Sequence, residues 1–336
     1  MSPAEGLREV CWKTQPNIVV TRGAIETPEQ YVPGVPLDKP WESCLTMGTQ
    51  WQYKPTNDVY KSGGKLIELL IETRAKGGNL LLNVGPKPDG QLPIEQEERL
   101  REIALWNFIN GESIYGVRPW VVTNEKDVWF TRKKGEDTVY AFVTKTQWKL
   151  GEWKEFTLRS VKTTHESKIS VVGQSGDVLE YRPEVTPRTT WRQDAGGLHI
   201  RAMRAQRIYN DRRWPNPVVL KITHAQPGMT PPEVSTAGAR WDAAGGVAVL
   251  EGVLKNLGKA ASVEAGFQYR QRKAITDLYE KTDPWKDAGY VARSATRPYR
   301  LRWTPPEKGQ SYDIRAVVKH RLITICGDEV ALATEK

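Results

Sequence analysis

The spacing of apolar residues along the chain changes near residue 115. Before this point, a short apolar run at 17–20 predicts a buried strand, and residues 62–84 predict a helix followed by a second strand. A further helix is predicted over 94–111, with acidic residues in its first turn. Its apolar stripe consists of Leu100, Ile103, Ala104 and Phe108. Strands that alternate with helices predict a parallel sheet or barrel, whose functional groups lie at the C-terminal ends of the strands.

After residue 115 the pattern is one of short apolar runs separated by turns. Over 115–225 this pattern is typical of an antiparallel β-sandwich. The Pro-rich stretch AQPGMTPPE at 225–233 predicts a linker, and β-type runs resume after it. In this last part YDIRAVV resembles a late strand of a fibronectin type III domain, with Tyr312 as its tyrosine-corner residue. We therefore expect three domains, at 1–114, 115–225 and 226–336.

The charge of the chain is unevenly distributed. Its formal net charge is +9, yet residues 1–120 hold 13 basic and 15 acidic side chains, so the basic surplus lies beyond them. The densest basic cluster consists of Arg201, Arg204, Arg207, Arg212 and Arg213. Such a cluster is either a polyanion-binding patch or an ordinary solvated strand face. Because no nucleic-acid-binding motif accompanies it, we expect no nucleic-acid partner.

Several classes of chemistry are excluded by composition. The three cysteines are isolated and the four histidines all follow residue 164, so the first half has no His-based metal site and no Ser–His pair. We expect no cofactor. No apolar run reaches the length of about 18 residues that a membrane helix needs, so no membrane span is predicted. Chemistry in the first half must therefore depend on carboxylates.

Carboxylates are concentrated at residues 22–51, RGAIETPEQYVPGVPLDKPWESCLTMGTQW. This stretch combines Glu26, Glu29 and Glu42 with Arg22 and Trp51. A carboxylic acid, a fixed cation and aromatic faces are the components of a sugar-cleaving pocket.

Residues 17–120 resemble the C-terminal part of the catalytic barrel of α-L-fucosidases, which are retaining glycoside hydrolases. The matching motifs are the TPEQY segment, PWESCLTMGTQWQY, GGNLLLNVGPKPDG and INGESIYGVRPW. The resemblance implies an α/β plus all-β fold: the last strands of a partial TIM-type (β/α) barrel, an antiparallel β-sandwich, and a second, fibronectin III-like sandwich. It also implies a substrate, a fucosylated oligosaccharide or glycoprotein glycan.

The resemblance carries roles onto individual residues. It places Glu29 as the general acid/base, Arg22 as a contact to fucose, and Trp51 as an aromatic wall of the sugar site. Glu42 is an alternative acid or a supporting group, and Glu26 is a further alternative. An acid of this kind needs a raised pKa, and aromatic walls that exclude water favour it.

The match lacks one essential group. A retaining glycosidase needs a second carboxylate as nucleophile, and the family's aspartate has no counterpart here, because residues 1–16 contain no aspartate. We therefore expect a fucosidase fragment with little or no hydrolytic activity alone. The TPEQY form suggests α-1,3/1,4 linkages. The full-length protein is expected to be secreted, periplasmic or lysosomal, although no signal peptide is visible here.

Two other classes of function stay open at this point. The chain could be a non-catalytic glycan-binding or cell-surface protein that uses its two β modules. It could also bind polyanions through its basic surplus, in which case its retention on heparin or DNA would fall steeply with salt.

Overall fold

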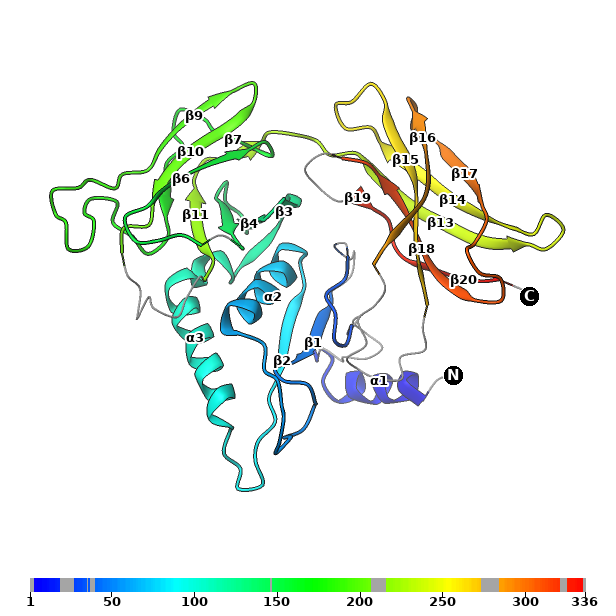
Figure 1. The fold of residues 1–336 in the computed structure, drawn as a ribbon, viewed down its shortest axis with the longest axis horizontal. Coiled ribbons are helices and arrows are strands. Elements are labelled where there is room, and N and C mark those ends of the chain that lie inside the picture. Colours follow the sequence, from blue (N-terminus) through cyan, green and yellow to red (C-terminus); the bar gives the residue numbers. More distant parts are fainter. Residues whose placement is uncertain are drawn as a thin grey trace. The chain divides into compact units, whose positions relative to one another are not determined.

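The computed structural model describes residues 3–18, 27–34, 36, 40–145, 147–206, 216–272, 284–320 and 325–334. In this part the chain is mostly β-structure with few helices. It forms two compact units, Met1–Gly228 and Met229–Lys336 (Figure 1). The unit boundary falls within the Pro-rich stretch at 225–233.

The described helices are α1 (Pro3–Thr14), α2 (Gly63–Ala75) and α3 (Ile94–Asn110), followed by the 3-10 turn η1 (Gly111–Ser113). α2 begins at Ser62, whose hydroxyl accepts a hydrogen bond from the Lys65 amide. It ends at Ala75 and is followed by Gly77, whose φ of 86° suits glycine and stops the helix. The helix predicted within 62–84 and the helix predicted over 94–111 are thus confirmed.

Two parallel strands follow the predicted α/β pattern. β1 (Glu42–Thr46) pairs in parallel with β2 (Asn79–Asn83), and α2 connects them. A parallel pair joined by a helix is a β-α-β unit. The prediction of a strand at 17–20 is wrong for Asn17 and Ile18, because the Ile18 amide donates to the Gln15 carbonyl and closes a turn after α1. The other two residues of that run lie outside the described residues.

The sandwich of the first unit is antiparallel, as predicted. One sheet has the order β3-β4-β5-β11-β8 and another the order β6-β10-β9, while β7 pairs with β12. The bounds are β3 (Val117–Glu125), β4 (Val128–Lys133), β5 (Val139–Val143), β6 (Trp153–Leu158), β7 (Val161–Lys162), β8 (Ile169–Val171), β9 (Thr190–Asp194), β10 (Gly197–Met203), β11 (Val218–Ile222) and β12 (Gln226–Pro227).

The α/β segment and this sandwich share one hydrophobic core. α2 lies between the parallel strands and the five-stranded sheet (Figure 1). Ile67 and Ile71 of α2 pack in one cluster with Tyr140, Phe142 and Val219 of the sheet. Because these residues are almost fully buried, the segments predicted as separate domains at 1–114 and 115–225 fold against each other.

The buried face of α3 differs from the predicted stripe. Phe108 is 81% exposed and Ala104 is also exposed, whereas Gln96, Trp106 and Asn110 are buried. Trp106 sets this rotation, because its indole packs on Phe142 and its Nε1 donates to the Pro217 carbonyl. The prediction was wrong for Ala104 and Phe108, whereas Ile103 packs against the core as predicted.

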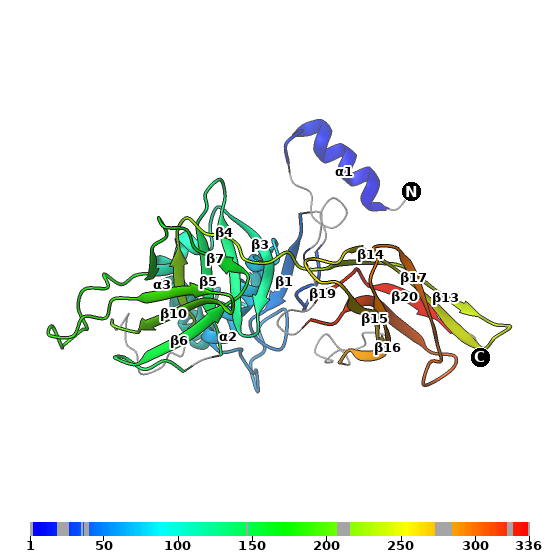
Figure 2. The same cartoon turned by 90° about the horizontal axis from the view of Figure 1, so that it is seen from above.

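The second unit is a two-layer β-structure. One layer has the order β13-β14-β17, and the other has β16-β15-β18 with β19 and β20 both paired to β18. The ring of Phe267 lies near that of Tyr299, and the ring of Tyr269 lies near that of Trp303. Rings from β15 thus meet rings from β17, and Figure 2 labels these two strands. The bounds are β13 (Glu233–Asp242), β14 (Val247–Asn256), β15 (Val263–Gln271), β16 (Lys286–Arg293), β17 (Pro298–Trp303), β18 (Ser311–Val318), β19 (Ile325–Cys326) and β20 (Val330–Ala333).

Candidate functional site

Glu29 lies on a short segment that extends the parallel sheet beside β1. Glu29 forms a parallel β-bridge with Cys44. In this bridge the Cys44 amide donates to the Pro28 carbonyl and the Gln30 amide donates to the Cys44 carbonyl, each at 2.9 Å. Residues paired across strands project from the same face of a sheet. The Glu29 side chain, which is half-buried, therefore shares a face with Cys44 and with Leu81, the partner of Cys44 on β2.

This face is the open side of the parallel sheet. On the opposite side, Ser43 and Leu45 are buried. On the Glu29 side Leu81 is 49% exposed. Successive side chains of a strand alternate between faces, so Glu42 also projects toward the open side. The structure thus brings Glu29 and Glu42 to one accessible surface.

Side-chain hydrogen bonds also hold the segment that carries Glu29. The Gln30 side chain bonds with the Thr46 side chain at 3.2 Å, and the Ser43 hydroxyl donates to the Tyr31 carbonyl at 2.9 Å. The ammonium of Lys76, which is only 5% exposed, donates to the Pro33 carbonyl at 2.6 Å. A half-buried carboxylate on a segment anchored at several points keeps a defined position, as a catalytic acid requires.

Glu42 occupies a different level of the same sheet. It is the first residue of β1 and pairs with Asn79 at the start of β2. Glu29, by contrast, is level with the middle of β1. Because functional groups in parallel β/α folds gather at the C-terminal ends of the strands, Glu29 is nearer to the functional edge than Glu42.

Trp51 lies beyond the C-terminal ends of both strands. Its carbonyl accepts a hydrogen bond of 2.7 Å from the Asn83 side chain at the end of β2. The same loop passes directly over Gly85, where a Cβ would come within 2.7 Å of the Tyr53 amide nitrogen. Only glycine permits this approach, so Asn83 and Gly85 together determine where the Trp51 loop runs.

The loop after β1 is further fixed by Asp58 and Lys61. One Asp58 oxygen accepts hydrogen bonds from the Thr49 amide and hydroxyl and from the Val59 amide. Burial tends to raise the pKa of Asp58, but these bonds outweigh burial and hold the pKa below its ordinary value. The Lys61 ammonium donates to the Thr46 carbonyl at 2.6 Å, and burial lowers the pKa of Lys61.

The remaining predicted site residues, Arg22 and Glu26, lie outside the described residues. Sequence reasoning missed Asp58, Lys61 and Lys76, whose roles in anchoring loops come from tertiary contacts. Asn83 and Gly85 could have been found, because both belong to the NVGP motif that follows β2. Within the described ranges no group of His, Cys, Asp or Glu side chains could hold a metal ion, and no helix is both long and apolar enough to cross a membrane.

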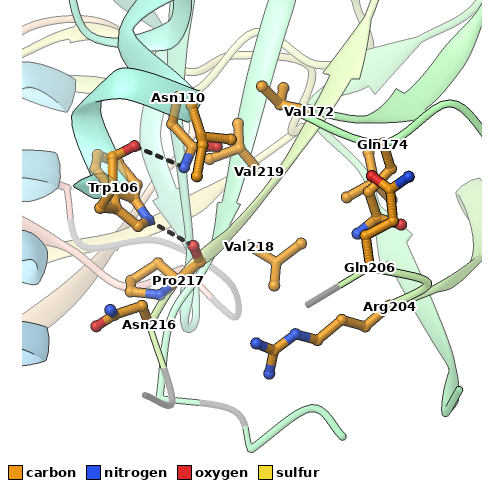
Figure 3. Close-up of a pocket in the computed structure, with 12 residues that line it drawn as sticks. Trp106, Asn110, Val172, Gln174, Arg204, Gln206, Asn216, Pro217, Val218 and Val219 are labelled. Atoms are coloured by element: carbon orange, nitrogen blue, oxygen red, sulfur yellow. Dashed lines mark hydrogen bonds between the residues drawn. The ribbon is translucent and has the colours of Figure 1, made fainter. Parts of the chain in front are cut away.

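A separate pocket of about 50 Å³ lies between α3 and strands β8 and β11 (Figure 3). Trp106, Val172 and Val219 line its apolar side, and Gln174 and Arg204 contribute polar groups. None of the predicted site residues lines this pocket. It therefore belongs to the junction between the helices and the sandwich.

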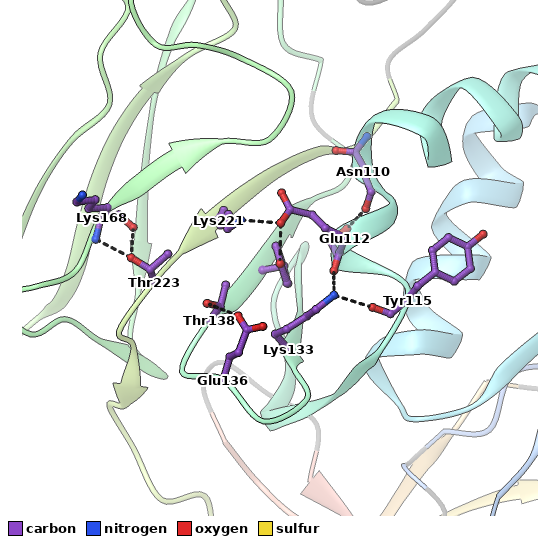
Figure 4. Close-up of polar contacts among 11 residues, drawn as sticks. Asn110, Glu112, Tyr115, Lys133, Glu136, Thr138, Lys168, Lys221 and Thr223 are labelled. Carbon is purple, nitrogen blue, oxygen red and sulfur yellow. Dashed lines mark hydrogen bonds and ion pairs between the residues drawn. The ribbon is translucent and has the colours of Figure 1, made fainter.

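Polar contacts reinforce that junction at the INGESIYG segment (Figure 4). The Glu112 carboxylate accepts a 2.6 Å bond from the Lys221 ammonium and a 3.0 Å bond from the Tyr140 hydroxyl. Burial tends to raise the pKa of Glu112, but these two donors outweigh it and hold the pKa below its ordinary value. Burial and the neighbouring Glu112 raise the pKa of Tyr140. The motif thus ties η1 to β5 and β11.

The predicted basic cluster does not present its described members as one patch. The Arg201 guanidinium stacks over the Trp153 ring at 3.9 Å, whereas Arg204 donates to the Trp148 carbonyl. The other three arginines of that cluster lie outside the described residues. These two arginines have structural partners, which favours the reading of an ordinary strand face.

Comparison with known proteins places the first part of the chain. The family model for Alpha-L-fucosidase matches residues 9–112. The plasma alpha-L-fucosidase of Rattus norvegicus is 35% identical over 151 residues, which are 43% of this chain and 32% of the relative. The tissue alpha-L-fucosidase of Mus musculus is 38% identical over 159 residues, which are 45% of this chain and 33% of the relative.

A solved structure agrees with the fold. Alpha-L-fucosidase isoenzyme 1 from Paenibacillus thiaminolyticus superposes with a TM-score of 0.50 at 21% identity, over 66% of this chain and 53% of that chain. This chain spans about a third of the length of the curated relatives it matches. The matched residues 9–112 include both Glu29 and Trp51, so this part of the chain is similar to α-L-fucosidases.

Proposed function

We propose that this chain is part of an α-L-fucosidase that hydrolyses terminal α-linked L-fucose from glycans with retention of configuration. The observation that carries the proposal is the placement of Glu29. It is half-buried on an anchored segment, on the open face of a parallel sheet, near the strand ends where Trp51 lies. α-1,3/1,4-linked fucose is the proposed linkage, and fucosylated oligosaccharides or glycoprotein glycans are the proposed substrates.

In this mechanism Glu29 protonates the glycosidic oxygen as the rest of the glycan leaves and the nucleophile bonds to fucose, and the Glu29 carboxylate then deprotonates the water that releases fucose from the nucleophile. Glu42 and Glu26 remain alternatives for this role. Trp51 would pack on the apolar face of the sugar, and Arg22 would bind its hydroxyls. The covalent step needs a second carboxylate about 5 Å away, and we propose that this nucleophile is supplied by a part of the barrel that these residues do not include. The chain alone would then be inactive.

The architecture proposed for the enzyme is a partial (β/α) barrel, a β-sandwich and a fibronectin III-like module. The arrangement of the second unit as two antiparallel sheets supports the last assignment. So does Tyr312, whose hydroxyl donates to the Glu307 carbonyl five residues upstream, as a tyrosine corner requires. Secreted, periplasmic or lysosomal location is proposed for the full-length protein.

A chimera tests the catalytic assignment. Residues 17–120 would replace the matching segment of the mouse tissue enzyme, and release of p-nitrophenol from its α-L-fucoside would be followed. We expect an active chimera that loses about 100-fold or more in kcat/KM with Glu29→Gln. The unmodified chain alone should release no fucose.

Glu95→Gln, the same change at an exposed glutamate outside this segment, serves as the matched control. A folded, active chimera that is insensitive to Glu29→Gln would contradict the role of Glu29. Fucose release by this chain alone, abolished by Glu29→Gln, would contradict the missing nucleophile.

A further inference from the structure

Gln30, the residue after Glu29, has a backbone conformation that is uncommon for a residue other than glycine. Its φ is 64°, which lies in the left-handed region. A Cβ atom makes this region sterically costly, so glycine adopts it freely and glutamine rarely does. Such a conformation persists where the surrounding structure holds it. At Gln30 the holding contacts come from β1.

The conformation of Gln30 ends the pairing of its segment with β1. Glu29 is paired with Cys44, and in a parallel ladder that continued, the Thr46 amide would donate next to the Gln30 carbonyl. The Thr46 amide instead donates to Oε1 of the Gln30 side chain, at 3.4 Å. The side chain of Gln30 thus takes the place of its own backbone carbonyl, at the point where the chain turns out of the sheet.

Thr46 is a firm point for this contact, because it is fully buried at the end of β1. Its hydroxyl donates to the Gly48 carbonyl at 2.8 Å and accepts from Nε2 of Gln30 at 3.2 Å. Its carbonyl accepts from the Lys61 ammonium at 2.6 Å, where a continued ladder would place the Val32 amide. Two side chains therefore complete the edge of β1 where backbone pairing stops.

Glu29 stands directly before this turn. The bridge to Cys44 holds one side of the Glu29 residue, and the contact between Gln30 and Thr46 holds the other. A change of φ at Gln30 would rotate the chain on one side of this residue against the other and displace Glu29. A displacement of about 1 Å can cost a catalytic group about 100-fold in rate.

We propose that Gln30 is a positioning residue, which aims the Glu29 carboxyl at the glycosidic oxygen without touching the substrate itself. Glycine would adopt the same φ without strain, but it would supply no side chain to Thr46 and would reach many other conformations. Glutamine combines the turn with the contact that fixes it. This inference rests on the proposed function and adds to it the residue that orients the acid.

Hydrogen exchange on the full chain tests the contact without reference to activity. Gln30→Ala removes the acceptor of the Thr46 amide, so we expect this amide to exchange faster than in the parent protein. Gln91→Ala is the matched control, because Gln91 is an exposed glutamine on the turn after β2. It should leave exchange at Thr46 unchanged. Equal exchange at Thr46 in the parent protein and in Gln30→Ala would overturn the proposal.

Kinetics in the chimera described above test the role. We expect Gln30→Ala to lower kcat by about tenfold or more and to change KM by less than about threefold, because the contacts to the sugar remain. The variant that also carries Glu29→Gln should be no slower than Glu29→Gln alone, since an acid that is absent cannot be misaimed. A general loss of structure would instead add to the loss from Glu29→Gln.

Gln30→Gly, which reaches the left-handed region without strain, carries the same test if Gln30→Ala does not fold. It should also lower kcat, because it lacks the contact to Thr46. An unchanged kcat, a rise in KM alone, or additive losses in the double variant would overturn the positioning role and leave Glu29 as the acid. A folded chimera whose activity survives Glu29→Gln would defeat the proposed function itself, and this inference with it.

Discussion

Glu29 pairs with Cys44, so its side chain projects from the same face of the sheet as that of Glu42, two residues before Cys44. Both carboxylates meet the same accessible surface, but at different levels. Glu29 lies at the middle of β1 and Glu42 at its first residue. The relationship gives two nearby candidates for one chemical role and a means to separate them.

The two carboxylates should differ in their effect on turnover. In the chimera described above, we expect Glu42→Gln to keep kcat/KM within about tenfold, while Glu29→Gln loses about 100-fold or more. The reason is the position of Glu42 at the N-terminal end of its strand. The measurement is steady-state kinetics with an aryl α-L-fucoside.

Azide distinguishes a lost acid/base from a disturbed fold. It attacks the glycosyl-enzyme without needing a base, so it should restore turnover of an activated fucoside by Glu29→Gln alone. Rescue of Glu42→Gln instead would reverse the two assignments.

The buried ammonium of Lys76 should stabilise the segment that carries Glu29. Lys76→Met removes the hydrogen bonds to the Pro33 carbonyl and the Glu72 carboxylate, leaving the former without its buried donor. We expect the free energy of unfolding to fall by about 1–3 kcal/mol and amide exchange at Gln30 to quicken. Denaturant unfolding and hydrogen exchange measure the two effects.

Lys65→Met is the matched control, because Lys65 lies on the same helix with its side chain 53% exposed in an ion pair with Glu68. It should change stability by less than about 0.5 kcal/mol. Equal losses from the two variants would argue against a specific anchor at Pro33.

Glu112 should make the first unit more sensitive to acid. Its folded pKa lies below the ordinary value of 4.5, so its contribution is present above that pH and is lost as pH falls through the folded pKa. Glu112→Gln should cost about 1 kcal/mol at neutral pH, since the group is partly exposed, and should flatten the loss of stability below about pH 4.5. Thermal unfolding measured from about pH 3 to about pH 7, a range that includes the ordinary pKa of 4.5, tests this prediction.

Glu136→Gln provides the comparison for that pH series. Glu136 is exposed near the same strands, and its carboxylate accepts a long hydrogen bond of 3.5 Å from the Thr138 hydroxyl (Figure 4). Its variant should follow the parent protein across the series. If the Glu112→Gln protein loses stability at acid pH as the parent protein does, the Lys221 and Tyr140 contacts contribute nothing to the stability.

Tyr312 should stabilise the second unit through its hydroxyl. The hydroxyl donates to the Glu307 carbonyl at 2.9 Å and accepts from the Glu307 amide at 3.1 Å, in a residue only 2% exposed. Tyr312→Phe leaves both backbone groups without this partner, so we expect a loss of about 1–3 kcal/mol. Calorimetry on the full chain should show a lower transition for the second unit only.

Tyr181→Phe, at an exposed position of the first unit, should leave both transitions unchanged. If Tyr312→Phe lowers neither transition, the hydroxyl contacts are replaced by water without cost.

The sequence by itself determined the local elements and the chemical candidates. The periodicity of 62–84 and 94–111 specified α2, β2 and α3, because apolar spacing, caps and glycine stops act within a few residues. The motifs indicated a resemblance to α-L-fucosidases, whose family model matches residues 9–112, and they named Glu29 as a candidate acid. The short apolar runs after 115 likewise became antiparallel strands.

Only the tertiary structure decided which faces are buried and which side chains meet. The contact between Trp106 and the sandwich rotates α3 and leaves Phe108 exposed, against its helical periodicity. Lys76 anchors the segment that carries Glu29 by donating to the Pro33 carbonyl, which lies 43 positions earlier in the chain. Such long-range contacts depend on how elements pack together, and no local pattern records them.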